Sequence, residues 1–296
     1  MSSLELYGYG ESVASNMARV ALSEKLVTYK YNLVPLEISG GHLTKAYKKI
    51  NPKNLVPTLV DDGKPIPDSI EIMKYIDQKY PNQGVSLFPN LTNGDLFDDL
   101  LEFVYLDESK ELGETLGTTA GGISAHILVK MLCKRPLLSV IWDYATKHSI
   151  KKRVPIFIML RILGKPPKNL EINMVKMLAK HLLKIEQTLN HKKGFMMGDD
   201  YTAIDSCMAS ILHRVQEMRF GSLLDSDKLP NLKAYWNNIS SRDSYKVGIL
   251  DYVTGDWEPE IIKLYGDGPN IHNDLAWSEI NNLLKGDDEW TNQYAK

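Results

Sequence analysis

Apolar positions in the first 80 residues switch repeatedly between the period of a strand and the period of a helix. The segments 4–9 and 28–34 have strand patterns. Between them, four apolar residues recur at i, i+4, i+7 and i+8, which predicts a helix: Val13, Met17, Val20 and Ala21. A short helix with a lysine-rich outer face is predicted over 43–50. A strand–helix–strand connection of this kind implies that the first two strands are parallel neighbours.

The stretch 51–75 predicts a hairpin followed by a helix. Two short strands, 58–60 and 64–66, flank Asp61-Asp62-Gly63, and an Asp-Gly turn favours a hairpin. Asp68-Ser69 then opens a helix with apolar residues at helical spacing: Ile70, Met73 and Ile76. The pattern adds antiparallel strands to the parallel pair.

Helical patterns alone follow from residue 90 onward. Thr92-x-x-Asp95 and Thr202-x-x-Asp205 have the capping-box pattern, the second with Asp in place of Glu. A long amphipathic helix is predicted over 175–189, and Pro230 precedes another short one.

These patterns predict an α+β chain in three parts. A small α/β domain covers 1–82, and a helical domain covers 90–250 with a helical insertion at about 113–170. An extension, 251–296, follows.

Composition narrows the class of protein. Hydrophobic content of 43% and charged content of 24% are ordinary for a globular chain, and a net charge of -2 predicts no nucleic-acid partner. The N-terminus has no signal-peptide pattern, and no apolar run approaches the ~20 residues that span a bilayer. We therefore expect a cytoplasmic protein. Cys133 and Cys207, without a CxxC motif, are predicted to be separate buried thiols in a reducing compartment.

Charge is distributed unevenly within this near-neutral total. Residues 130–168 hold ten Lys/Arg and a single acidic residue, Asp143. Residues 251–296 hold ten Asp/Glu against three lysines. The two segments are therefore candidates for mutual contact.

An ordered set of motifs resembles the cytosolic glutathione transferases. The motifs cover 4–112 and 170–247, and they are LxLY at 4–7, SVASNMARVAL at 12–22, GGHL at 40–43, NPKNLVPTL at 51–59, DSIEI at 68–72, GDDYTAID at 198–205 and PNLKAYW at 230–236. The resemblance implies a thioredoxin-like domain followed by an all-α domain, assembled as a homodimer. It also implies glutathione as co-substrate, and no metal.

The resemblance places the activating hydroxyl after the first strand. A free thiol has a pKa of about 8.5, and a hydroxyl donor beside a helix N-terminus favours its anion. Ser12 matches the serine of the theta, phi and zeta classes. Ser15 is the alternative, because related bacterial β-etherases align a serine nearer to it. Both serines also suit a purely structural role as helix N-caps.

The same resemblance assigns the glycine and cysteinyl ends of glutathione. His42 and Asn54 would lie at the glycine end, although an exposed loop histidine is an equal alternative for His42. Val56 would pair its backbone with the cysteinyl part, as one strand adds to another. Pro57 is then expected in cis.

The γ-glutamyl end falls to Asp68 and Ser69. Asp68 would take the ammonium, and Ser69 with the helix N-terminus would take the carboxylate. Two departures from the family pattern stand out, because Val13 replaces a common proline and Asp68 replaces a longer Glu or Gln. Asp205 is implied to be structural.

The insertion resembles that of bacterial lignin β-etherases and, more loosely, of ganglioside-induced differentiation-associated proteins. Three alternatives remain open: structural helices on the outer face of the dimer, matched by the acidic extension; a lid on the electrophile site; or contact with a membrane surface. Candidate walls of the electrophile site are Tyr9, Tyr105, Met131 and Trp142. Three tryptophans in the extension, Trp257, Trp277 and Trp290, predict that it packs on something.

The resulting hypothesis is a detoxifying glutathione transferase in which Ser12 stabilises the thiolate that attacks a hydrophobic electrophile. One alternative is a glutathione-dependent β-etherase, lyase or dehalogenase on the same fold. Another is a non-catalytic ligand-binding or scaffold protein.

Overall fold

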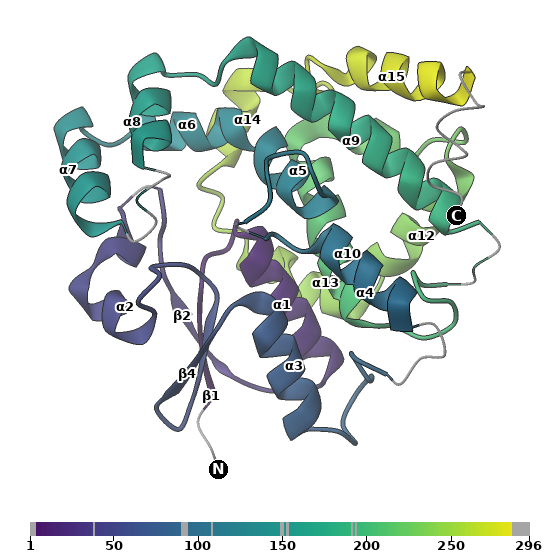
Figure 1. Cartoon of the computed structure of the whole chain (residues 1–296), viewed down its shortest axis with the longest axis horizontal. Helices are drawn as coiled ribbons and strands as arrows, with labels where there is room; N and C mark the ends of the chain where they lie inside the picture. Colours follow the sequence, from purple (N-terminus) through teal and green to yellow (C-terminus); the bar gives the residue numbers. More distant parts are fainter. Residues whose placement is uncertain are drawn as a thin grey trace. The chain divides into compact units, whose positions relative to one another are not determined.

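A computed structural model of the chain describes residues 4–37, 39–89, 94–107, 109–148, 151, 154–190, 192 and 194–285 (Figure 1). The chain folds into two compact units. The first combines Met1–Pro89, Ala125–Pro166 and Asp243–Glu260. The second combines Asn90–Ser124, Pro167–Arg242 and Ile261–Lys296.

The first unit is built on a mixed four-stranded sheet of order β2-β1-β3-β4. Its strands are β1 (Leu4–Gly8), β2 (Lys30–Leu33), β3 (Thr58–Asp61) and β4 (Lys64–Pro67). β1 pairs in parallel with β2 and antiparallel with β3, and β3 and β4 form a hairpin across Asp62-Gly63. The parallel pair and the hairpin confirm the pattern predicted from the sequence.

Three helices accompany the strands: α1 (Val13–Glu24), α2 (Lys45–Ile50) and α3 (Ser69–Lys79). The predicted stripe of α1 is buried, and α1 packs against α3 (Figure 1). α13 (Asp243–Gly248) also packs along α1. A Cβ at Gly248 would lie 2.9 Å from the Val20 Cα, so glycine permits this close approach of the two backbones.

The segment predicted as one helix over 43–50 is divided in two. A 3-10 turn, Gly41–Leu43, precedes α2, and the Thr44 side chain accepts the Tyr47 N–H at 3.2 Å. This side-chain cap starts a new helix two residues later than the apolar pattern predicts.

Three helices of the insertion belong to the same unit as the sheet. They are α6 (Ala125–Cys133), α7 (Leu137–Lys147) and α8 (Val154–Leu163). Their inner side chains share one buried cluster with the 3-10 turn, formed by Leu43, Leu132, Val140, Tyr144 and Val154, with Phe157 and Ile158 packed against it. The insertion therefore completes a core of the thioredoxin-like unit.

The second unit is helical. It contains α4 (Gly94–Val104), α5 (Leu116–Ile123), α9 (Lys168–Thr188), α10 (Ala203–Val215), the π-turn η3 (Gln216–Phe220), α11 (Gly221–Leu224), α12 (Pro230–Ser240) and α15 (Asn273–Lys285). α14 (Glu258–Tyr265) begins in the first unit and ends in the second. α9 packs against α5 and α15. Beyond β4, the described residues form no further strand, apart from one isolated bridge between Phe195 and Gly198.

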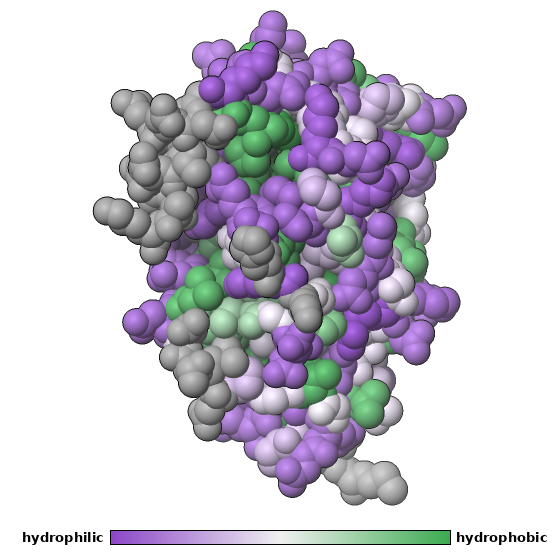
Figure 2. Space-filling model, turned by 90° about the vertical axis from the view of Figure 1, so that its right-hand side faces the viewer, coloured by the Kyte–Doolittle hydropathy of each residue, from purple (hydrophilic) through white to green (hydrophobic). Residues whose placement is uncertain are grey.

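The face of the molecule drawn in Figure 2 is mainly hydrophilic, with smaller groups of apolar residues among the hydrophilic ones.

Asp205 starts the core helix of this unit, as the resemblance implied. Its fully buried carboxylate accepts the N–H groups of Met196 at 2.9 Å and Thr202 at 2.8 Å, and the Tyr235 hydroxyl at 2.8 Å. The Thr202–Asp205 capping box is confirmed. The Thr92 pattern and Trp290 lie outside the described residues, whereas Trp257 is buried.

No single helix among the described residues is long and apolar enough to cross a membrane, and only the bent pair α5–α6 has that length and composition when counted together.

His181 predicts how the second unit responds to acid. Its ring is buried, stacks edge-on against Phe103 and lies 3.0 Å from the Thr119 hydroxyl, and burial lowers the pKa of His181 to about 4. Between pH of about 6.5 and 4, the unfolded chain therefore binds a proton that the folded chain does not. Burial of the neutral ring is therefore compatible with full stability at neutral pH. The free energy of unfolding falls as the pH drops through that window, by roughly 2 kcal/mol at pH of about 5. We expect His181→Gln to weaken the pH dependence of the free energy of unfolding by this amount, measured by urea denaturation. An unchanged pH dependence in the variant would contradict this prediction.

Candidate active site

Ser12 lies at the N-terminus of α1, in the turn after β1. It is half-buried and serves as the N-cap of α1, because its Oγ accepts the Ser15 N–H at 3.2 Å. Ser15 is fully buried, and its Oγ accepts the Tyr9 N–H at 3.3 Å. Accepting these bonds uses oxygen lone pairs and leaves the Ser12 hydroxyl hydrogen able to donate. An anion beside Ser12 would therefore meet both a hydroxyl donor and the positive end of α1.

Arg19 fixes the turn that precedes Ser12. Its side chain is fully buried and donates to the carbonyl oxygens of Tyr9 at 3.2 Å, Gly10 at 3.1 Å and Gly248 at 2.8 Å. The guanidinium also lies 4.5 Å from the centre of the Tyr252 ring. A buried charge is tolerated when it is hydrogen-bonded throughout in this way, so the turn, α1 and α13 are held together.

A C-terminal strap, residues 250–257, lies against the same turn. The Thr254 N–H donates to the Glu11 carboxylate at 3.0 Å, and the Tyr9 hydroxyl donates to Asp256 at 3.3 Å. A Cβ at Gly10 would come within 2.2 Å of the Tyr252 carbonyl oxygen. Tyr9 is consequently buried, and burial with the nearby Glu11 raises the pKa of its hydroxyl. The sequence predicted through Trp257 that the extension packs on something, and Trp257 is buried, but the contact of the strap with the turn after β1 was not predicted.

The loop before β3 presents an unused length of backbone. The Val56–Pro57 peptide bond is cis, as the resemblance implied. Among the described residues, no hydrogen bond engages the main-chain N–H or C=O of Val56. The preceding Leu55 carbonyl is held by the Tyr47 hydroxyl at 2.6 Å and by the Asn51 amide at 2.9 Å. Half-buried Val56 therefore keeps both groups available for a strand-like partner.

Asp68 and Ser69 form the N-terminus of α3. Asp68 adopts a φ of 82° and a ψ of 138°, a conformation that costs a non-glycine residue about 1–3 kcal/mol and that clusters at active sites and ligand clamps. Its Oδ1 accepts the Ile70 N–H at 2.8 Å, which confirms the cap. Ser69 is buried, with its hydroxyl 3.8 Å from the Met17 sulfur.

His42 and Asn54 lie together at the other end of the loop. The Asn54 amide donates to the His42 carbonyl at 2.5 Å, and the His42 side chain is buried rather than exposed. Its Nδ1 has no hydrogen-bond partner among the described residues. Burial, with the neighbouring His148 and Arg135, lowers the pKa of His42 to about 4, so the ring is neutral at physiological pH.

Arg135 is a neighbour of this end that sequence reasoning did not single out. It follows α6, is buried, and pairs with Asp143. A Cβ at Gly40 would lie 3.0 Å from its Nη1, an atom without a hydrogen-bond partner among the described residues. The high Lys/Arg content of the insertion was the one available signal. The permanent charge beside the His42 loop thus comes from the insertion.

The residues predicted to line an electrophile site do not form a common surface in the first unit. Met131 is fully buried in α6, Tyr9 is buried by the strap, and the Trp142 side chain is 66% exposed. Tyr105 belongs to the second unit. Their joint role therefore stays a prediction. In the part of the chain that the structure describes, no three His, Cys, Asp or Glu side chains gather to hold a metal ion. Cys133 and Cys207 are unbridged, and Cys207 is buried as predicted, whereas Cys133 is half-buried.

Two family models match the chain. The model for the glutathione S-transferase N-terminal domain matches residues 6–84, and the model for the glutathione S-transferase C-terminal domain matches residues 152–243. The chain belongs to the glutathione S-transferase superfamily. This family uses glutathione as a substrate, and its fold combines a thioredoxin-like domain with a helical domain, which confirms the predicted fold class.

Individual glutathione S-transferase relatives match different parts of the chain. It is 42% identical to "Glutathione S-transferase Z1" of Arabidopsis thaliana over 78 residues, which are 26% of this chain and 35% of the relative. The match thus spans about a third of the length of that relative. Protein LigF of Sphingobium sp. strain SYK-6 is 25% identical over 82% of this chain and 91% of its own.

Solved glutathione S-transferase structures share the fold. The crystal structure of β-etherase LigF has a TM-score of 0.69 at 20% identity, covering 83% of this chain and 98% of that chain. A theta-class glutathione S-transferase from Xanthomonas axonopodis pv. citri, solved with glutathione bound, has a TM-score of 0.59 at 18% identity, covering 84% and 98%. At these identities the likeness establishes the fold alone.

The contact between Gly10 and the strap can be tested by a substitution that adds one methyl group. We expect Gly10→Ala to destabilise the first unit by about 1–3 kcal/mol, because the methyl would meet the Tyr252 carbonyl and backbone must move. Denaturant unfolding, with faster proteolysis within 250–257, measures the effect. Gly121→Ala is the matched control, since a Cβ there meets nothing within 4 Å and alanine favours the helix. Equal stability of the two variants would show that the strap does not approach Gly10.

Proposed function

We propose that this chain is a serine-type glutathione transferase that joins the glutathione thiolate to a hydrophobic electrophile. The observation that carries the proposal is that one unit contains the half-buried Ser12 at the N-terminus of α1, the unused backbone of Val56, and the strained Asp68 with Ser69 at the N-terminus of α3. Family membership supports glutathione as the co-substrate. It also supports a cytoplasmic homodimer, which is part of the proposal.

Each of these residues would have a separate task. Val56 would pair its N–H and C=O with the cysteinyl backbone of glutathione, as an added strand does. Asp68 would accept from the γ-glutamyl ammonium, while Ser69 and the α3 N-terminus would hold the adjacent carboxylate. His42 and Asn54 would border the glycine end, with Arg135 nearby as a permanent cation.

Ser12 would act on the sulfur. Its hydroxyl would donate to the thiolate, and the N-terminus of α1 would add a favourable field, so the pKa of the thiol would fall below about 8.5. The thiolate would then form an S–C bond, and a leaving group such as a halide or aryloxide would depart with the electron pair. The half-buried position of Ser12 supports it over Ser15, which is fully buried and accepts from the Tyr9 N–H.

A glutathione-dependent β-etherase is the second candidate. LigF, named a β-etherase, matches most of this chain in both sequence and fold. The bond-forming step would be the same, with an aryl ether as electrophile and an aryloxide as leaving group. Turnover of an aryl ether against an aryl halide separates the two candidates. A protein without heat of binding at millimolar glutathione would instead be the non-catalytic scaffold.

The first variant pair compares the two serines. We expect Ser12→Ala to raise the pKa of bound glutathione by at least about one unit, which corresponds to roughly tenfold less thiolate at neutral pH and a similar loss of rate. The pH titration of thiolate absorbance in the binary complex measures the pKa. Ser15→Ala should leave that titration unchanged and should instead lower stability, since the Tyr9 N–H loses its acceptor. If only Ser15→Ala shifts the thiol pKa, Ser15 is the activating residue.

The second pair separates binding from capping at Asp68. Asn is as good an N-cap as Asp, so Asp68→Asn should keep α3 stable, whereas Asp68→Ala should cost about 1 kcal/mol. Both variants should weaken glutathione binding by roughly 10–100-fold, because a charge-assisted hydrogen bond to the ammonium is lost. Calorimetry measures the affinity. Glutathione affinity that is unchanged in Asp68→Asn would reduce Asp68 to a structural cap.

A further inference from the structure

Helix α8 is apolar on both of its faces. Nine of its ten residues are apolar, with Arg161 as the exception. One face is directed to the core, where Val154 belongs to the buried cluster and Phe157 and Ile158 pack against it. Steps of 100° per residue place a second set on one continuous arc, all of it exposed: Pro155, Ile156, Met159, Ile162 and Leu163. The outer face of an ordinary amphipathic helix would be polar.

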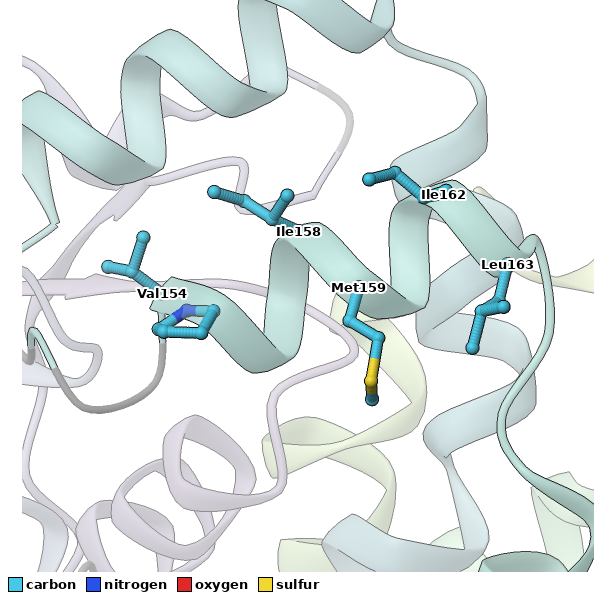
Figure 3. Close-up of a pocket in the computed structure, with 6 residues that line it drawn as sticks. Val154, Ile158, Met159, Ile162 and Leu163 are labelled. Atoms are coloured by element: carbon cyan, nitrogen blue, oxygen red, sulfur yellow. The ribbon is translucent and has the colours of Figure 1, made fainter.

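The exposure on α8 is substantial. The side chains of its four large exposed residues are between 44% and 62% exposed. A shallow groove of about 480 Å³ is lined by four of the outer residues together with Val154 and Ile158 of the core-facing side, and it contains none of the candidate glutathione-binding residues. Figure 3 shows Met159 and Leu163 projecting from one side of the helix, and Ile158 and Ile162 from the other.

Helix α7, which packs against α8, continues the pattern. Leu138 and Trp142 are separated by one helical turn and are 79% and 66% exposed. We define the α7–α8 surface as Leu138, Trp142, Ile156, Met159, Ile162 and Leu163. Exposed apolar side chains gathered on two helices that pack together mark an interaction site more often than a bare monomer face.

The charge of the segment that contains α7 and α8 indicates the kind of partner that this surface would bind. The segment 130–168 carries ten Lys/Arg against one acidic residue, in a chain with 35 Lys/Arg and 37 Asp/Glu in total. That one acid, Asp143, is already paired with Arg135 and with Lys147 at 2.6 Å. Lys151 and Lys165, at either end of α8, are exposed. The segment that bears the apolar surface is therefore basic, with Lys134 paired to Glu260 of α14 at 3.4 Å.

We propose that the α7–α8 surface docks on an anionic lipid membrane. Apolar side chains would enter the boundary between headgroups and acyl chains, with Trp142 at a depth that tryptophan favours, and the lysines would attract acidic headgroups. A helix of ten residues is about 15 Å long, half of a hydrocarbon core, so α8 would lie in the interface and not span it. A second copy of the chain fits less well, because a two-fold interface would oppose two equally basic segments.

Vesicle sedimentation of the full chain tests this proposal. The vesicles are phosphatidylcholine alone, or equal parts of phosphatidylcholine and phosphatidylserine. We expect binding to the mixed vesicles and little binding to vesicles of phosphatidylcholine alone. Salt at about 1 M should release the protein, because screening shortens the range of electrostatic attraction to about 3 Å. Lys151→Gln with Lys165→Gln should weaken binding roughly fivefold for each lysine removed.

A charge-matched pair of variants locates the surface. Leu138→Glu with Ile162→Glu should abolish vesicle binding. Ile262→Glu with Ile271→Glu changes the net charge equally at exposed apolar positions of the second unit and should leave binding intact. Circular dichroism confirms that each variant is folded.

Three results would overturn the proposal. They are the absence of sedimentation with the mixed vesicles, equal binding to phosphatidylcholine alone, and equal loss in both glutamate pairs. A wild-type dimer that Leu138→Glu with Ile162→Glu dissociates, without any vesicle binding, would assign the surface to a second copy.

Discussion

The buried guanidinium of Arg19 is the interaction on which the first unit depends. It joins the carbonyls of the turn after β1 to the end of α13, and its flat face rests on Tyr252 of the strap. Those partners come from opposite ends of the chain, yet they define the turn that presents Ser12. Because a wholly buried cation without these acceptors is very costly, the turn, α1 and the strap have a single mutually consistent arrangement.

Sequence patterns predicted what depends on local chemistry. The helix starts at Ser12 and at Asp68-Ser69 are recognised within a few residues, because capping is a property of short segments. The same holds for the Thr202–Asp205 capping box. The cis bond of Val56-Pro57 was implied by the family resemblance, and the strained conformation of Asp68 was not predicted. Apolar periodicity located α1, and the Asp-Gly turn located the hairpin. The start of α2 was predicted too early, because the Thr44 side-chain cap begins the helix at Lys45.

Contacts between residues far apart in the sequence could not be predicted from short segments. Nothing near Gly10 in the sequence indicates that the Tyr252 carbonyl will lie against it. From its sequence neighbours, His42 is equally consistent with an exposed loop residue. It is buried in the structure, where the adjacent Leu43 packs with α6, α7 and α8, which begin more than 80 residues later. Arg135 was hidden for the same reason, because one arginine in a basic segment is not distinguishable by composition from its neighbours.

The insertion has two faces with different roles in the first unit. Its inner face shares a core with Leu43, the residue after His42, and Arg135 lies against Gly40 of the same loop. Its outer face is the α7–α8 surface. α8 packs through Phe157 and Ile158 on the cluster that contains Leu43, so one helix contributes both to the core beside the proposed glycine end and to the α7–α8 surface.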